Sequence, residues 1–291
     1  MRKDKFKKKT NEERKVELTT ALQKLEDGVV DMFTSDRYKE YLRFFSQMHN
    51  YSFNNTILIL SQYPQASRVA SFQTWKSMHI SVKKGEKANK VLVPIPYHKE
   101  IVNVNADNPE DKEIVKIDKL YFKLGNVFDI GQTDGELPSL SNELLDNPEE
   151  LTKAIPILMR CNSIPTEFEE SLRGDSANGY YHVVDNRIAI KPDMTSAQTF
   201  KTLIHEKAHS ILHTKDTKYS RNEAEVQAES IAYIVSNALG LDTSEYSFGY
   251  IAGWSKNKDI AELKQSLVLI EQTSKSILKW ITDNTELQLV S

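Results

Sequence analysis

One stretch decides the fold of the C-terminal half of the chain: Thr195-Ser196-Ala197-Gln198-Thr199-Phe200-Lys201-Thr202-Leu203-Ile204-His205-Glu206-Lys207-Ala208-His209-Ser210-Ile211-Leu212. Its apolar residues recur at three- and four-residue intervals, which is the spacing of one buried helix face. Thr195 and Gln198 are placed as a capping box at its start. The pattern predicts an amphipathic helix over residues 196–213.

Within this helix, His205 and His209 stand four residues apart. That spacing puts both imidazoles on the same face, close enough to share one cation. Zinc (Zn²⁺) is the predicted ion, because its catalytic sites combine imidazole and carboxylate ligands and leave one position for water. Glu206 is predicted to be the general base that takes a proton from the zinc-bound water. The sequence thus predicts a zinc-dependent hydrolase site of the peptidase kind; the alternative is a solvated helix that carries two histidines by chance.

A second helix, predicted over residues 222–239, supplies the remaining carboxylate. Glu225 and Glu229 lie four residues apart on the same face of it. We assign Glu225 as the third ligand, in a gluzincin-like set, and Glu229 as the carboxylate that orients a ligand histidine. His213 is interpreted as a cation at the end of its helix rather than as a ligand. The residue that stabilises an oxyanion stays open among three tyrosines, Tyr233, Tyr246 and Tyr250.

The rest of the C-terminal half is predicted to be mainly helical, with one short antiparallel sheet. Helices are expected near residues 150–160 and over residues 258–283. Between the first of these and the metal-binding helix, residues 179–184 and 187–190 read as two strands joined by a turn at Asp185-Asn186. The segment 182–190 is expected to pair with an extended peptide substrate by adding a strand to the sheet.

The N-terminal half mixes helices with strands. Helical periodicity covers residues 11–48, and a short helix begins at Ser52 and stops before Pro64. A further short helix is expected from Phe72. Strands are expected at 82–87, which ends in a basic turn, at 91–96, whose prolines favour a sheet edge, and as a pair within 119–130, while 103–113 is expected to be a polar loop.

These elements predict an α+β fold with two domains. The first is a small α/β DNA-binding domain over residues 1–130, in which residues 1–10 form a basic tail. The second is a mainly helical, zincin-like metallopeptidase domain over residues 150–291. The acidic stretch 131–149, rich in Gly, Pro and Ser, is the predicted linker.

Composition excludes several classes of protein. No apolar run approaches the roughly 20 residues that cross a bilayer, and the basic N-terminus lacks the apolar segment of a secretory signal. The single cysteine, Cys161, excludes an intramolecular disulfide framework and a cysteine-based metal cluster. We therefore expect a cytoplasmic protein with no membrane partner.

The net charge of −3 hides an asymmetry between the two halves. Residues 1–100 carry 19 basic and 11 acidic side chains, a balance of +8, whereas the remainder has a balance of −11. A basic first domain favours a polyanionic partner. The alternative is chance segregation, because the basic tail alone contributes a net five of these charges.

Several motifs, in order along the chain, resemble one known family. Tyr51-Ser52-Phe53-Asn54-Asn55-Thr56, Phe72-Gln73-Thr74-Trp75-Lys76 and Val82-Lys83-Lys84-Gly85-Glu86-Lys87 resemble the N-terminal domain of ArdC-type antirestriction proteins. Val127-Phe128-Asp129-Ile130 with Gln132-Thr133 is similar to the end of that domain. His205 to His209 followed by Glu225-Val226-Gln227-Ala228-Glu229 resembles their C-terminal metallopeptidase domain, itself similar to ImmA/IrrE peptidases. Residues 242–254 look like a branch found on mobile elements, including LtrC-like proteins.

The resemblance implies a protein of a conjugative or otherwise mobile element that binds single-stranded DNA and protects incoming DNA from restriction. A single-strand binder needs aromatic faces for base stacking and cations along the backbone. The candidate DNA-contacting residues are Tyr51, Asn54, Arg68, Trp75, Lys76, Lys83, Lys84 and Lys87. Two alternatives stay open: the aromatic residues, with Phe53 and Phe72, belong to the domain core, or the basic turn is merely solvated.

Three functions stay open for the whole chain. In the first, a zinc peptidase with an unknown protein substrate is brought to its target by a DNA-binding domain. In the second, the chain is a DNA-binding antirestriction factor whose metal site is structural or vestigial; the intact Glu206 favours the first. In the third, the peptidase cleaves a repressor, as the resemblance to the ImmA group implies.

Overall fold

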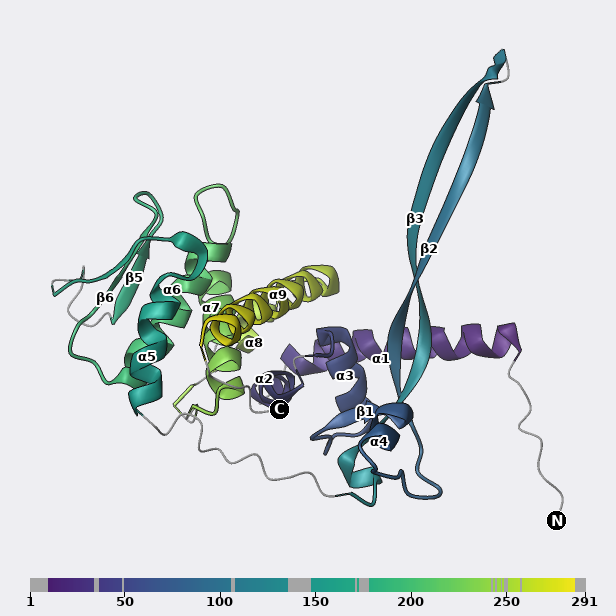
Figure 1. Cartoon of the computed structure of the whole chain (residues 1–291), viewed down its shortest axis with the longest axis horizontal. Helices are drawn as coiled ribbons and strands as arrows, with labels where there is room; N and C mark the ends of the chain where they lie inside the picture. The colour runs from purple at the N-terminus through teal and green to yellow at the C-terminus, as the bar shows by residue number, and fades with distance from the viewer. Residues whose placement is uncertain are drawn as a thin grey trace.

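The computed structural model of the chain describes residues 10–33, 37–48, 50–105, 108–135, 148–170, 172, 178–241, 243, 245–246, 248, 251–256 and 258–285. Within these residues the fold is α+β, as predicted, with a helix-and-strand N-terminal part followed by a mainly helical C-terminal part (Figure 1). The expected basic tail, apart from its last residue, and residues 136–147 of the expected linker lie outside the described residues. No described helix combines the length and the apolar character that a membrane span requires.

The N-terminal part begins with three helices, α1 (Asn11–Phe33), α2 (Arg37–Gln47) and α3 (Phe53–Gln62). The single helical pattern predicted over 11–48 is therefore two helices. The predicted start at Ser52 is confirmed, because its side chain accepts the backbone N–H of Asn55 at 3.3 Å. The short helix expected from Phe72 is α4 (Phe72–Ser77), which follows β1 (Val69–Ser71).

A three-stranded antiparallel sheet in the order β1-β3-β2 completes this part. The strand β2 (Asn89–Asn105) lies at an edge, where its two prolines need no partner, as predicted. It pairs with β3 (Asn108–Asp129) along a long hairpin that projects away from the helices (Figure 1). Residues 82–87, predicted to be a strand, form only one bridge, Val82 to Thr133, before the basic turn.

The hairpin corrects two predictions. The polar loop expected over 103–113 is wrong, because the strands run to Asn105 and resume at Asn108. The strand pair expected within 119–130 is instead the end of one strand. The β-branched residues of 101–104 and 114–117 favour extended backbone, and they outweigh the Asn, Asp and Glu residues between them.

The C-terminal part is mainly helical and contains a second small sheet. Its helices are α5 (Pro148–Met159), α6 (Ser196–Leu212), α7 (Arg221–Ala238), α8 (Ile251–Ser255) and α9 (Ile260–Asn284). The predicted hairpin is β5 (Gly179–His182) and β6 (Arg187–Ile190). A strand that the sequence pattern did not reveal, β4 (Thr166–Phe168), pairs with β6 in parallel, so β6 lies in the middle of the sheet and β5 at an edge. The segment 182–190, expected to pair with a peptide, therefore consists mostly of the central strand β6, and for β6 that prediction is wrong because both of its edges are already paired. Among the described residues, β5 has a free edge, and it shares only His182 with that segment.

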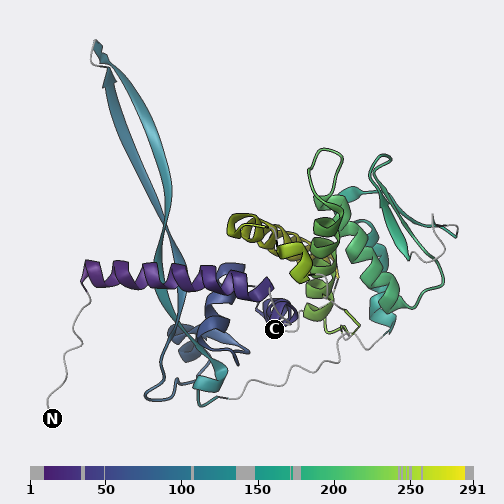
Figure 2. The ribbon, with the colours of Figure 1, turned by 180° about the vertical axis from the view of Figure 1, so that it is seen from behind.

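The two parts share one hydrophobic core, which runs from α1–α3 to α6, α7 and α9. Polar contacts cross the same boundary: the hydroxyls of Tyr38 and Ser230 are 2.8 Å apart, and Glu271 accepts the backbone N–H of Phe53 at 2.7 Å. The view from behind also shows α2 lying beside α7 (Figure 2). The helices of the N-terminal part thus support the helix pair that carries the candidate site.

Candidate metal centre

The candidate site is built on two neighbouring helices, α6 and α7. Thr195 Oγ1 accepts the backbone N–H of Gln198 at 3.2 Å, which is the first of the two hydrogen bonds of the predicted capping box. Ser220 caps α7 in the same way, by accepting the backbone N–H of Glu223. The apolar stripes of the two helices are buried in the shared core, and this packing turns their histidines and glutamates toward one another.

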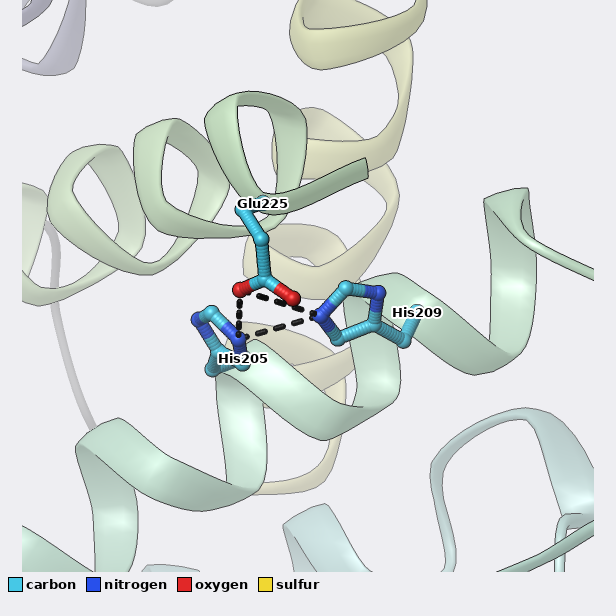
Figure 3. Close-up of side chains that lie close together, drawn as sticks. All are labelled: His205, His209 and Glu225. Carbon is cyan, nitrogen blue, oxygen red and sulfur yellow. Dashed lines mark hydrogen bonds and ion pairs between the residues drawn. The ribbon is translucent and has the colours of Figure 1, made fainter. Parts of the chain in front are cut away.

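His205, His209 and Glu225 converge between these helices (Figure 3), with one ligand-type atom from each lying within 4.8 Å of the others. The two Nε2 atoms are 3.0 Å apart. Glu225 Oε2 lies 3.6 Å from His205 Nε2 and 3.9 Å from His209 Nε2. Two imidazole nitrogens and one carboxylate oxygen are one of the donor sets found in catalytic zinc sites.

The charges of these groups also suit a cation. Burial lowers the pKa of His205, but the hydrogen bonds and charges of Glu225 and Glu229 outweigh it and raise the pKa to about 10. Burial and the neighbouring positive charge of His205 lower the pKa of His209. The cluster thus stabilises one positive charge between the carboxylates, which is the condition that a bound cation needs. The residues present fit a divalent metal ion.

Glu229 lies where a carboxylate would orient a ligand histidine. Its Oε2 is 3.3 Å from Nδ1 of His205, on the opposite side of the ring from Glu225. A proton held between Glu229 and Nδ1 leaves the Nε2 lone pair of His205 free to bind a metal.

His209 has a corresponding partner in His213, which is fully buried at the end of α6. The Nδ1 atoms of the two rings are 2.9 Å apart, and His213 Nε2 is 2.9 Å from Gln227 Oε1. Gln227 Nε2 in turn donates to Ser266 Oγ at 2.9 Å. The glutamine oxygen accepts only, so His213 carries its proton on Nε2 and accepts at Nδ1. His209 therefore donates through Nδ1 and keeps Nε2 for a ligand.

Glu206 follows the ligand His205 on α6, and the residue is buried, with only 7% of its surface exposed. Burial raises the pKa of its carboxyl to about 7, although the charge of His205 opposes the shift. The residue lines a cavity of about 410 Å³ together with His205, Glu229 and Gly179 of β5. A carboxyl group with this pKa, in the wall of a cavity, can exchange protons at neutral pH.

The three tyrosines considered for an oxyanion differ in position. Tyr246 lines the same cavity, where the Lys201 ammonium lies 5.6 Å from its ring centre. Lys201 also pairs with Glu245. Tyr233 is buried against Tyr246 in the core, and Tyr250 lies outside the described residues. Tyr246 is therefore the candidate of the three that reaches the cavity.

Lys207 is a structural residue that sequence reasoning missed. Its side chain is fully buried, and Nζ donates to the backbone oxygens of Met159 and Cys161 at 2.8 Å and to Thr166 Oγ1 at 2.9 Å. It therefore ties the end of α5 and the start of β4 to α6. The signal in the sequence is its place seven residues after Phe200, on the apolar face of the helix.

The predicted DNA-contacting aromatic residues are engaged within the fold. Trp75 is 2% exposed, and its indole N–H donates to the backbone oxygen of Phe128 at 2.8 Å. Tyr51 is half-buried and donates to the backbone oxygen of Val69 at 3.2 Å. Asn54 is also half-buried on α3, where the next residue, Asn55, bonds both backbone groups of Leu92. The indole of Trp75 has no free face for a base.

The predicted cations have a different environment. Lys76, Lys83, Lys84 and Lys87 are exposed, and Arg68 is half-buried. Gln132 fixes the end of the basic turn, residues 83–87, by hydrogen bonds. Its side-chain amide donates to the backbone oxygen of Lys87 at 2.9 Å and to the carboxylate of Glu86 at 3.0 Å. Gly85 has φ 96°, which favours glycine. The fold thus presents the lysines of this turn to solvent.

Comparison with known proteins relates the N-terminal part to one family and gives two similar solved structures. An uncharacterised protein of Bacillus anthracis is 30% identical over 328 aligned positions, which cover 96% of this chain and 54% of that protein, so the chain spans about half of its length. The crystal structure of the antirestriction ArdC protein from the R388 plasmid in its metal-free form has a TM-score of 0.46 and 16% identity, covering 86% of this chain and 99% of that one. Its Mn(II)-bound structure gives a TM-score of 0.43 and 18% identity, covering 80% and 83%. Residues 8–128 of the chain match the family described as the N-terminal domain of anti-restriction factor ArdC.

Proposed function

We propose that the chain is a metal-dependent peptidase whose N-terminal part binds single-stranded DNA, and that it serves a mobile element as an antirestriction-type protein. The convergence of His205, His209 and Glu225 beside the buried Glu206 carries the peptidase proposal. The family match of residues 8–128 supports the antirestriction and DNA-binding proposal. Zinc is the proposed ion because of its preference for imidazole with carboxylate.

Each residue of the site has a proposed task. Nε2 of His205, Nε2 of His209 and a carboxylate oxygen of Glu225 would hold the ion, which when bound would polarise a carbonyl and make water more acidic. Glu229 and His213 keep the two imidazoles in the tautomers that binding requires.

Glu206 is the proposed general base. Its carboxylate takes a proton from the attacking water and returns it to the leaving amine, and a pKa near 7 suits both transfers at neutral pH. The free edge of β5, next to the cavity through Gly179, is the proposed place for the substrate backbone. Tyr246 is the proposed donor to the developing oxyanion.

Metal analysis tests the ligand set. The purified chain is expected to hold one zinc ion, and His205→Ala, His209→Ala and Glu225→Ala each to lose stoichiometric metal. Glu229→Ala is the matched control on α7, and it is expected to bind zinc more weakly while reaching full occupancy at excess metal. If Glu225→Ala keeps its zinc and Glu229→Ala does not, the two glutamates exchange roles. Manganese is measured in parallel.

Glu206→Gln tests the chemistry. The variant removes the base and no ligand, so it is expected to keep its zinc and its thermal stability and to hydrolyse labelled casein at least about 100-fold more slowly. Binding of a peptide hydroxamate to the zinc-loaded wild type, measured by calorimetry, separates an open catalytic site from a closed structural one. No hydroxamate binding, with equal hydrolysis by wild type and variant, would favour the alternative of a DNA-binding factor with a structural metal.

DNA binding by the whole chain is tested separately. We expect a labelled single-stranded oligonucleotide to bind more tightly than a duplex of the same length, with little base preference and a steep decrease with salt. The triple variant Lys83→Gln, Lys84→Gln, Lys87→Gln is expected to flatten the salt dependence. A wild-type chain that binds neither DNA at low salt would refute this part of the proposal and leave the metal site standing.

A further inference from the structure

The β2–β3 hairpin forms a two-stranded arm that leaves the rest of the fold in both whole-molecule views (Figures 1 and 2). Near its base, Val91 and Leu92 are buried against the helices, but from Pro94 outward the described side chains are exposed. Two strands without a covering layer gain little stability by themselves. The large apolar side chains on this arm therefore form an exposed surface of the kind that binds another molecule.

The register of the hairpin sorts these side chains onto two faces. Ile95 is paired with Tyr121, and Tyr97 with Lys119, so these four share one face with the next pair, Val93 and Lys123. The opposite face carries the pairs Pro94–Phe122 and Pro96–Leu120. At these pairs one face thus mixes aromatic rings with lysines, whereas the other is apolar. The basic side chains of the second face, Lys90 and His98, belong to the pairs with Asn126 and Asp118 on either side of it.

We call the first of these the aromatic–lysine face, and define it by Tyr97, Lys119, Tyr121 and Lys123. Its two rings are 41% and 51% exposed and meet edge to face, with centroids 5.6 Å apart. Lys119 and Lys123 flank Tyr121 two residues away on either side, on the same face of the strand. An exposed ring between two cations provides a stacking surface with charges for the phosphates on both sides.

The charges on the half of the arm nearer the helices favour a polyanion over a protein partner. Over residues 89–98 and 118–126 the sequence contains three lysines and one acid, Asp118. That acid belongs to the opposite face and pairs with His98 at 2.7 Å, so it does not neutralise the lysines beside Tyr121.

The arm also offers what the predicted stacking residues lack. Trp75 and Tyr51, the aromatic residues expected to stack on bases, are engaged within the fold.

We propose that the aromatic–lysine face of the arm is the docking surface for single-stranded DNA, with bases stacked on Tyr97 and Tyr121 and phosphates beside Lys119 and Lys123. This rests on the proposed DNA-binding function and gives it a location different from the basic turn and α4. The contacts are to ring faces and backbone charges, so binding on the arm is independent of base sequence.

The test compares two variants of the full chain. The first, Tyr97→Thr with Tyr121→Thr, keeps residues that favour strands and removes the rings. It is expected to weaken single-strand binding by at least about five-fold for each lost ring. The second, Leu120→Thr with Phe122→Thr, removes two large apolar side chains from the opposite face of the arm, both on β3, and is expected to bind as wild type. A third variant, Lys119→Gln with Lys123→Gln, is expected to reduce the slope of log affinity against log salt by about 1.4.

Affinity, oligomeric state and metal content are measured for every variant. If the wild type binds single strands and Tyr97→Thr with Tyr121→Thr binds equally well, the arm assignment is wrong while the DNA-binding function stands. Equal losses in the two threonine variants would overturn the assignment to this face. A wild-type dimer that the first variant dissociates, without any change in DNA affinity, would make the face a contact between copies of the chain. A wild type that binds no DNA refutes the function itself.

Discussion

At the scale of single residues, the tautomer of His209 depends on His213. The interpretation of His213 as a cation at the helix end is wrong, because burial lowers the pKa of its imidazole and the ring is neutral. The chain of hydrogen bonds from His209 through His213 and Gln227 to Ser266 is buried and has one consistent arrangement of protons. Partners of this kind typically change metal affinity by about 10- to 100-fold. We therefore expect His213→Leu to weaken zinc binding by that factor, measured by competition with a chelator.

His213→Gln is the matched control, because its amide offers an acceptor to His209 and a donor to Gln227. It is expected to recover part of the lost affinity. His213→Leu with the affinity of the wild type would show that His209 is held in place by packing alone.

Lys207 makes a second prediction at this scale. Its removal leaves one buried and two half-buried oxygen acceptors without this donor, and a buried acceptor left unpaired costs about 1–3 kcal/mol. Lys207→Met is therefore expected to lower the free energy of unfolding by about 3 kcal/mol or more, measured by urea denaturation. Lys215→Met, at an exposed position just beyond α6, is expected to change it by less than about 0.5 kcal/mol. Similar values for the two variants would contradict the role given to Lys207.

These residues show where prediction from sequence ends. The place of His205, His209, Glu225 and Glu229 follows from the 3.6-residue period, since a spacing of four fixes a common helix face. The partners of His213 and Lys207 come from other elements, α7, α5 and β4, and no local period encodes such contacts. What was predictable is the face of each helix; what was not is which residue of another element meets it.

At the scale of elements, the packing of α1 against α3 depends on Gly28. A methyl group at this position would lie 2.6 Å from Cγ2 of Ile57, which is fully buried. Alanine would gain about 1 kcal/mol of helix propensity, but overpacking a closed core costs about 1–3 kcal/mol. We expect Gly28→Ala to destabilise the chain in thermal unfolding.

The matched control is Gly253→Ala in α8, where a methyl group would meet nothing within 4 Å. This variant is expected to leave the melting temperature unchanged or to raise it. A Gly28→Ala variant that is as stable as Gly253→Ala would mean that the two helices are not packed this closely.

The strands show the limits of local patterns in another way. The edge position of β2 was predictable from its prolines, and the pair β5–β6 from alternation and a turn. The arm beyond residue 98 was not, because Asn, Asp and Glu are typical of loops, whereas a long antiparallel register is set by pairing with a distant segment. The parallel strand β4 has three residues, too few for any period to appear.

At the scale of the whole molecule, the two parts are joined by more than a linker. Tyr38, Ser46 and Phe53 of the N-terminal part bond to Ser230, Asn237 and Glu271. The core that surrounds these contacts includes residues from both parts. The domain boundaries proposed at 130 and 150 therefore separate two parts that are expected to unfold together, because neither can lose its helices without exposing the other's core.

Hydrogen exchange in low concentrations of urea tests this expectation. The slowest amides of α3, in the N-terminal part, and of α7, in the C-terminal part, should reach the same free energy of opening and the same dependence on urea, since both helices belong to the shared core and exchange only in global unfolding. Amides of the arm around Tyr97 and Tyr121 provide the contrast. They belong to two strands without a covering layer, so they should exchange through local opening at a much smaller free energy. Two separate values for α3 and α7 would mean that the parts unfold independently, in which case a 1–130 fragment would fold alone and could be used to measure DNA binding directly.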